Sequence, residues 1–438
     1  MPTQAEFHRR SLAERERFWA EQADLIHWHK RPSVICNDRN APFVRWFEGG
    51  ETKLCFNAVD RHAAERPDAL ALVFISTETE ETRRYTFAEL KSEVMCAAAM
   101  LQDLGVGRGD RVLIYLPNTA EACFVMLACV RIGAIHSVVF GGFAAASLAT
   151  RIDDARPKLL ICADAGMRAG KPVPYKHLVD EACRLAQNPP AKVLILDRGI
   201  DRGYARIPGR DVDYAELRRE HLGAEVPVTW LESNEPSYIL YTSGTTGRPK
   251  GVQRDTGGYA VALAASMRHI YCGQPGETYF ATSDIGWAVG HSYIIYGPLI
   301  AGMSTIMYEG TPIRPDPGVW WRIVQDYRIS VMFSAPTAIR VLKKQDPAYL
   351  RQYDLDSLRH LFLAGEPLDQ PTHEWIATAL GKPVIDHYWQ TESGWPILSS
   401  SPGVEATPIK YGSPSFPVYG YDVRLFREDG SECGADEK

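Results

Sequence analysis

Residues 241–251, near the middle of the chain, are of the types that bind phosphate. They read Tyr-Thr-Ser-Gly-Thr-Thr-Gly-Arg-Pro-Lys-Gly and follow a short apolar stretch, residues 238–240. Glycines let backbone N–H groups approach an anion, and hydroxyl and ammonium groups add further donors. The spacing is not that of the Walker P-loop, because Gly244 and Gly247 are three residues apart and Pro249 precedes Lys250. Three glycines, four aliphatic hydroxyls and two cations favour a phosphate-binding loop over an ordinary surface turn.

Two further runs lie downstream of this loop. Residues 284–292 read Asp-Ile-Gly-Trp-Ala-Val-Gly-His-Ser, and residues 388–394 read Tyr-Trp-Gln-Thr-Glu-Ser-Gly. In order and separation the three runs resemble the motifs of the AMP-forming acyl-CoA synthetases, which belong to the adenylate-forming superfamily. The resemblance extends from about Trp19 to the C-terminus. Residues 250–255 are most similar to propionyl-CoA synthetases, because Arg254 stands where many relatives have His.

The resemblance implies a reaction in two steps. A carboxylate attacks the α-phosphate of ATP to give an acyl-adenylate and pyrophosphate, and the thiol of CoA then displaces AMP. An anion attacks a polyanion in the first step, so cations and hydrogen-bond donors are required around the phosphates. The resemblance assigns the α-phosphate to Thr391 and a magnesium ion to Glu392, since Mg²⁺ prefers one or two carboxylates plus phosphate oxygens. It assigns the outer phosphates to Thr242, Ser243, Gly244, Thr245, Thr246, Gly247 and Lys250.

The same resemblance assigns three further groups of residues. The adenine is expected to lie against Gly365, Glu366, Pro367, Asp386, His387, Tyr388, Trp389 and Gln390. CoA and the nucleotide path are expected to involve Phe140, Gly141, Gly142, Arg168, Lys171 and Ala335. Lys171 replaces a more usual Arg, so it keeps the positive charge but loses bidentate geometry. The acyl pocket is expected to be formed by Trp287, Ala288, Val289, Ala364 and Trp389.

Composition excludes several other classes of protein. The 438 residues carry a formal net charge of -6 and no block of lysines and arginines, which argues against a nucleic-acid partner. No apolar stretch reaches membrane-spanning length, and the N-terminus lacks the apolar core of a signal peptide. The nine cysteines are scattered without a C-x-x-C pair, which predicts a reducing, cytoplasmic location and neither a zinc site nor a disulfide framework.

The elements that must position these residues alternate between strands and helices. Residues 111–116, 137–140, 159–161 and 193–196 read as buried strands, with helices over residues 120–132 and 143–155. This rhythm predicts an α/β fold of two parallel-sheet subdomains packed together. The expected divisions are a helical, irregular cap over residues 1–80, α/β subdomains over residues 81–228 and 229–415, and the start of a small β-barrel over residues 416–438. Residues 238–240 are expected to open the second subdomain.

The leading hypothesis is the N-terminal part of a propionate-CoA ligase that uses ATP, Mg²⁺ and CoA. Relatives continue with a small C-terminal lid domain that carries an essential lysine, so this chain alone is expected to be incomplete for catalysis. Ala288 and Ala364 stand where acetate-specific relatives tend to have Val, which favours propionate over acetate. Three alternatives remain open: an acetate-CoA ligase, a nucleotide- or acyl-adenylate-binding fragment without turnover, and an amino-acid-adenylating domain. The last would need a carboxylate in an otherwise apolar pocket.

Overall fold

Two seven-stranded sheets form the body of the protein. The computed structural model describes residues 2–243, 249–434 and 437. The first sheet has the order β12 (Asp211–Asp213), β11 (Lys192–Leu196), β8 (Leu159–Ala163), β6 (Arg111–Tyr115), β7 (Ile135–Val138), β14 (Pro236–Ser243), β15 (Pro249–Asp255). The second has the order β20 (Val384–Asp386), β19 (His360–Leu363), β18 (Ile329–Ser334), β16 (Thr278–Ala281), β17 (Ser304–Glu309), β4 (Leu70–Ser76), β5 (Glu81–Thr86). The predicted α/β class is therefore confirmed.

The two sheets repeat one arrangement. In each, the first six strands of the order run parallel, and the seventh turns back on the sixth as an antiparallel hairpin. Parallel strands need helical crossovers, which explains the alternating sequence pattern. Three short antiparallel pairs lie outside these sheets: β1 (Val34–Asn37) with β2 (Arg45–Glu48), β3 (Glu51–Thr52) with β13 (Leu231–Glu232), and β9 (Gly166–Arg168) with β10 (Lys171–Val173).

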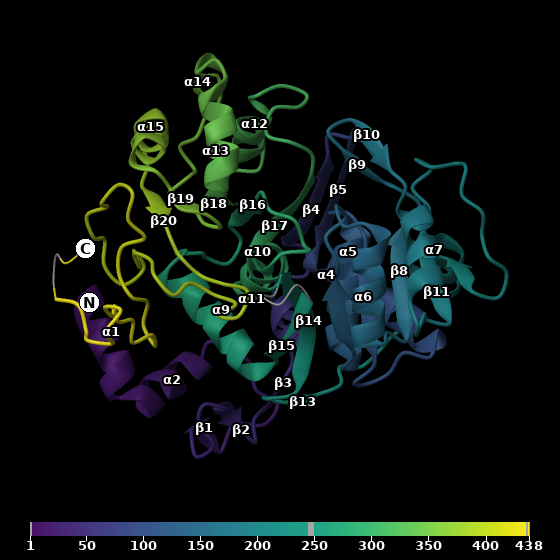
Figure 1. The fold of residues 1–438 in the computed structure, drawn as a ribbon, viewed down its shortest axis with the longest axis horizontal. Helices are drawn as coiled ribbons and strands as arrows, with labels where there is room; N and C mark the ends of the chain where they lie inside the picture. Colours follow the sequence, from purple (N-terminus) through teal and green to yellow (C-terminus); the bar gives the residue numbers. More distant parts are fainter. Residues whose placement is uncertain (1, 244–248, 435–436, 438) are drawn as a thin grey trace.

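Helices cover the sheets and fill the space between them (Figure 1). Strands of the first sheet are contacted by α5 (Ala120–Ile132), α7 (Tyr175–Leu185), α8 (Tyr214–Glu220) and α9 (Gly257–His269). Helix α6 (Ala145–Ala155) packs against α7. The second sheet is contacted by α4 (Phe87–Asp103), α12 (Val319–Asp326) and α15 (Gln370–Leu380), with α13 (Pro336–Lys343) packed on α15 and α14 (Ala348–Arg351) beyond. The remaining helical segments are α1 (Gln4–Ala13), α2 (Arg15–Ala23), η1 (Phe56–Asp60), α3 (Arg61–Glu65), α10 (Ala288–Gly290), η2 (His291–Tyr296) and α11 (Gly297–Ile300).

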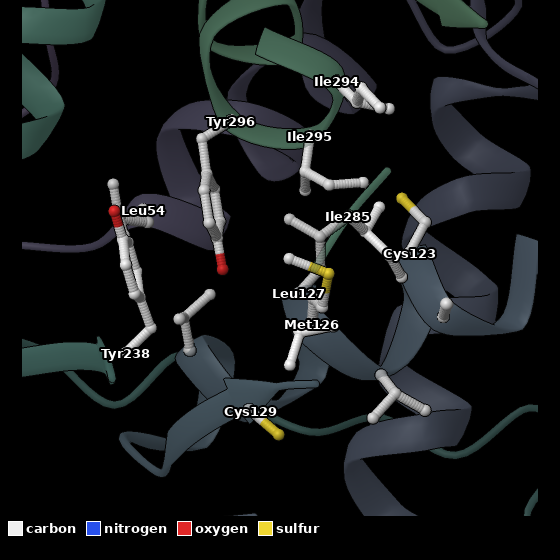
Figure 2. Close-up of a cluster of buried hydrophobic side chains, with 14 of the residues drawn as sticks. Leu54, Cys123, Met126, Leu127, Cys129, Tyr238, Ile285, Ile294, Ile295 and Tyr296 are labelled. Carbon is white, nitrogen blue, oxygen red and sulfur yellow. The ribbon is translucent and has the colours of Figure 1, made fainter. Parts of the chain in front are cut away.

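Helix α5 illustrates why these residues fold as they do. The hydroxyl of Thr119 accepts a hydrogen bond from the backbone of Ala122 and caps the N-terminus, and Gly133 ends the helix with a φ of 80°. Every residue of the helix except Glu121 is buried. Figure 2 shows Cys123, Met126 and Leu127 of this helix packed in the core that joins the two sheets.

Strand membership differs from the sequence prediction at two points. Strand β14, expected to open the second subdomain, pairs with β7 at Tyr238 and His136 and so belongs to the first sheet. Strand β4 lies within the region expected to be a helical cap, yet it pairs with β17 of the second sheet. Periodicity detects a strand but not its partners, which explains the first difference. At β4 the prediction differs in the element itself, because residues 70–76 fall within the expected cap. Near the C-terminus, where the start of a small β-barrel is expected, an antiparallel bridge between Phe426 and Glu432 closes a short hairpin.

The two ends of the described chain lie side by side. Helix α1 contacts the segment near residue 420, because the Ser11 hydroxyl accepts a hydrogen bond from the backbone of Gly420 at 2.7 Å. The carbonyl of Tyr421 lies 2.9 Å from Nε2 of His8. The N-terminal helices therefore hold the segment that follows the predicted site. No helix in the described part of the chain is long and apolar enough to span a membrane.

Candidate functional site

A central cavity of about 830 Å³ opens at the carboxyl ends of the second sheet. This is the edge at which parallel α/β sheets bind ligands. Helix α10 and the segments that follow β16, β18 and β19 contribute most of its walls. The residues that line it are Arg168, Thr282, Ser283, Asp284, Trp287, Ala288, Val289, Phe333, Ser334, Ala335, Thr337, Ala338, Ala364, Gly365, Trp389, Gln390 and Thr391.

All residues expected to form the acyl pocket line this cavity. Ala288 and Ala364 are buried and expose 8% and 5% of their surface, while Trp287 remains 45% exposed. The indole of Trp287 packs on Phe140 with ring centroids 5.3 Å apart. Trp389 meets Tyr293 edge to face at 5.5 Å. The wall is therefore aromatic and aliphatic, with two small side chains that leave space between the rings.

The segment 386–390 presents its residues in different ways. Tyr388 is 45% exposed, so its ring face is accessible to a planar ligand. His387 is 2% exposed, and both of its ring nitrogens have partners in the core: the carbonyl of Leu363 at 2.6 Å and the hydroxyl of Tyr271 at 2.9 Å. Burial lowers the pKa of His387 to about 4. The His387 side chain is therefore a neutral core residue, and its backbone is the part that remains a predicted contact with the adenine.

The neighbouring acidic residues are also held by the protein. Asp386 is 7% exposed, and burial raises its pKa to about 6. The carboxylate of Glu366 accepts a hydrogen bond from Thr337 and pairs with Arg340 at 3.1 Å. Of the predicted turn at residues 365–367, Gly365 alone lines the central cavity. Backbone groups of this turn thus remain the predicted contacts with a purine, while the Glu366 side chain fixes the turn to α13.

The predicted phosphate loop connects β14 to β15 as a hairpin. Thr242 pairs with Lys250 across the two strands, so their side chains share one face. Lys250 is exposed, and Thr242 is partly buried. Gly244, Thr245, Thr246 and Gly247 lie outside the described residues, as does the side chain of Ser243. The described part of the hairpin therefore places one ammonium and one hydroxyl beside the predicted loop.

The predicted metal ligand is accessible. Glu392 is exposed and follows Thr391, which lines the central cavity. Among the described residues, no group of three or more His, Cys, Asp or Glu side chains could enclose a metal ion. A magnesium ion that is held mainly by phosphate oxygens and one carboxylate needs no such enclosure. The arrangement around Glu392 fits that type of ion.

A side cavity of about 250 Å³ adjoins the central one. Both are lined by Arg168, Thr282, Ser283 and Asp284, and the side cavity also contains Phe140, Gly141 and Gly142. Arg168 and Lys171 are direct cross-strand partners in the β9–β10 hairpin, and both are exposed. Ala335 lines the central cavity instead. Arg168 and the predicted nucleotide residues thus lie along two cavities that share part of their lining, while Lys171 lies beside Arg168 on the hairpin and lines neither cavity.

Asp284 was missed as a site residue when the sequence was considered alone. It stands at the junction of the two cavities, and its Oδ1 accepts a hydrogen bond from the backbone of Gly286 at 2.7 Å. Burial raises its pKa to about 6. The polar run 282–284, directly after the buried strand β16, was the signal that could have identified it, because such residues lie at the carboxyl edge of a parallel sheet.

Comparison with known proteins agrees with this geometry. The model of a family described as AMP-binding enzymes matches residues 59–438, and that of the acetyl-coenzyme A synthetase N-terminus matches residues 4–58. The chain belongs to the AMP-binding enzyme family. Within this family, it is 59% identical over 435 residues to propionate–CoA ligases of Escherichia coli and Salmonella typhimurium, covering 99% of this chain and 69% of each relative. The resemblance inferred from the motifs is confirmed.

A more distant relative in the AMP-binding enzyme family is human. The mitochondrial acyl-CoA synthetase short-chain family member 3 is 43% identical over 426 residues, which cover 96% of this chain and 62% of the relative. All three relatives are named as ligases or synthetases that act with CoA.

Proposed function

We propose that the chain is the ATP- and acyl-binding part of an AMP-forming propionate–CoA ligase. The observation that carries the proposal is the apolar pocket of Trp287, Ala288, Val289, Ala364 and Trp389 beside Thr391 in one cavity. A carboxylate there lies near the residue assigned to the α-phosphate. The 59% identity to propionate–CoA ligases supports the same acid. Acetate is the alternative substrate.

The proposed chemistry follows from the groups present. Lys250 and the hydroxyls of the β14–β15 hairpin would neutralise the outer phosphates of ATP, and Thr391 would donate to the α-phosphate. Glu392 would bind Mg²⁺, whose charge offsets the repulsion between carboxylate and phosphate. Propionyl-AMP and pyrophosphate are the products of this step. The CoA thiol then attacks the acyl carbon and AMP leaves, with the phosphates of CoA near Arg168 and Lys171.

The size of the pocket determines the acid. A methylene group in an apolar pocket discriminates between substrates by about 1–3 kcal/mol, or roughly 10- to 200-fold. Ala288 and Ala364 leave room for one more carbon than acetate has, and the ring of Trp389 limits longer chains because overpacking is unfavourable. Propionate should therefore be preferred over both acetate and longer acids.

ATP–pyrophosphate exchange by the full-length enzyme, with acetate, propionate, butyrate and a panel of amino acids, tests the function. We expect propionate to exceed acetate by about one to two orders of magnitude in kcat/KM. Ala364→Val should shift the preference toward acetate. Ala377→Val, on α15 and outside the cavity, is the control and should leave the ratio unchanged. Faster exchange with an amino acid, or an unaltered ratio in Ala364→Val, would contradict the assignment.

A further inference from the structure

Arg254 joins two parts of the predicted phosphate site that are far apart in the sequence. It lies on β15, directly after the loop hairpin, and its side chain reaches the segment 391–393. Nη2 donates to the carbonyls of Thr391 at 2.6 Å and Glu392 at 3.0 Å, and Nη1 donates to the carbonyl of Ser393 at 3.2 Å. One guanidinium thus holds three consecutive carbonyl groups.

The fourth carbonyl of this turn is held from the acyl-pocket side. The hydroxyl of Ser292 on η2 donates to the carbonyl of Gly394 at 2.6 Å. The same hydroxyl lies 2.8 Å from that of Tyr259, and the guanidinium of Arg254 lies over the Tyr259 ring, 5.6 Å from its centroid. The turn 391–394 is therefore fixed on both sides, while Thr391 remains partly accessible and lines the central cavity and Glu392 is exposed.

The guanidinium fits closely against the backbone of this turn. Gly394 has a φ of 75°, and a Cβ atom added there would lie 2.8 Å from Cζ of Arg254. Arg presents a planar fork of donors that can hold several carbonyls at once, whereas Lys is a single point charge. A lysine at this position would keep the charge and lose the geometry.

We propose that Arg254 is a positioning residue that sets Thr391 and Glu392 relative to the β14–β15 phosphate hairpin. This inference rests on the proposed function. It assigns Arg254 to the adenylation step. Only that step requires Thr391, which is assigned to the α-phosphate, to be aligned with the loop assigned to the outer phosphates. Thiolysis of a supplied acyl-adenylate involves no β- or γ-phosphate, so its rate depends much less on this alignment.

The two half-reactions of the full-length enzyme test this assignment in Arg254→Lys. Adenylation is measured by ATP–pyrophosphate exchange with propionate, and thiolysis by release of AMP from supplied propionyl-AMP and CoA. We expect adenylation to fall by about 10- to 100-fold, since a misplacement of 1 Å can cost about 10²-fold. Thiolysis should stay within about threefold. A general loss of folded protein would lower both rates equally, so equal losses would overturn the inference.

A second pair of variants tests the same contact without replacing Arg254. Gly394→Ala should displace the guanidinium and reproduce the selective loss of adenylation. Gly381→Ala is the matched control: this glycine also has a positive φ, 61°, and caps α15, yet a Cβ there meets nothing within 4 Å. It should leave both half-reactions unchanged. Combined with Arg254→Lys, Gly394→Ala should add little further loss, because both act on one contact.

The possible results distinguish a failure of the proposed function from a failure of the role inferred for Arg254. If the unaltered full-length enzyme gives no exchange with any acid, the proposed function fails and this inference fails with it. If the unaltered full-length enzyme exchanges and Arg254→Lys exchanges equally fast, the inference alone is overturned. If Gly394→Ala behaves like Gly381→Ala, the contact between the guanidinium and the turn has no part in positioning.

Discussion

The two sheets share one strand arrangement but end in hairpins of opposite chemistry. In the first sheet, β14 and β15 flank a loop of hydroxyls and glycines with Lys250 at its far side. In the second, β4 and β5 flank residues 77–80, which read Thr-Glu-Thr-Glu. Both hairpins occupy the same place at the edge of six parallel strands. The fold therefore provides two equivalent hairpins, and their turn residues decide which one is suited to phosphate.

The acidic hairpin has a supporting role instead. Glu78 lines the side cavity, and its carboxylate accepts a hydrogen bond from the backbone of Gly170 at 2.8 Å. Gly170 lies in the turn between Arg168 and Lys171. One hairpin is thus predicted to contact the nucleotide directly, while the other holds the loop that presents the predicted CoA cations. Variants in the two hairpins and in the contact between the sheets can separate these roles.

The largest effect is expected where the sheets meet. Arg198, which follows β11 of the first sheet, makes a bidentate pair with Glu309 at the end of β17, with distances of 2.8 and 2.6 Å. Their side chains are only 9% and 5% exposed. Removing one partner of a buried pair leaves an uncompensated charge and costs about 3–5 kcal/mol. Arg198→Met should therefore lower the free energy of unfolding by this amount in denaturant titrations.

An exposed ion pair provides the control for that measurement. Arg322 and Asp316 lie 3.5 Å apart with side chains 39% and 31% exposed. Such surface pairs contribute about 0–1 kcal/mol. If Arg322→Met destabilises the protein as much as Arg198→Met does, the contact between the sheets is not a special source of stability.

The next largest effect is expected at the basic hairpin. Lys250→Ala should weaken ATP binding by about 1.5–3 kcal/mol, the value of a hydrogen bond to a charged group. The fold should remain intact, because the side chain is exposed. Calorimetric titration with ATP and magnesium measures the loss. Gln253→Ala, exposed on the same strand, is the control, and equal affinities for the two variants would remove this hairpin from the nucleotide site.

The smallest effect is expected at the acidic hairpin. Glu78→Ala removes the acceptor for Gly170 and should raise the KM for CoA a few-fold, since a hydrogen bond contributes about 0.5–1.5 kcal/mol. ATP affinity should not change. Glu78→Gln keeps an acceptor and removes a negative charge near Arg168, so its KM for CoA should be no higher than that of the unaltered chain. A rise in both variants would point to charge rather than to loop position.

The sequence predicted single elements of the fold better than their partners. Helix α5 has the bounds expected from its apolar run, because Thr119 and Gly133 mark its ends locally. Strands β14 and β4 could not be assigned to their sheets in this way. The partner of β4 is β17, more than 200 residues away, and no local pattern encodes that pairing.

The candidate site shows the same division between local and distant information. The residues that the motifs assign to the acyl pocket, Trp287, Ala288, Val289, Ala364 and Trp389, do line one cavity. The motifs gave no sign that the ring of His387 turns into the core or that Asp284 stands between two cavities. Both facts depend on which face of a segment packs against distant elements such as Tyr271.

The pairing of β4 also has a consequence for how the chain is made. During synthesis the β4–β5 hairpin leaves the ribosome first, and its partner β17 follows after roughly 230 more residues. At a synthesis rate of about 5–20 residues per second, the apolar strand Leu70–Ser76 remains without its partner strand on its inner edge for about 10–50 s. The first sheet can close during this interval, because all of its strands lie between residues 111 and 255, before β17. Nascent chains should therefore be most prone to misassembly before residue 309 is made, and chaperone binding to stalled chains of different lengths would reveal it.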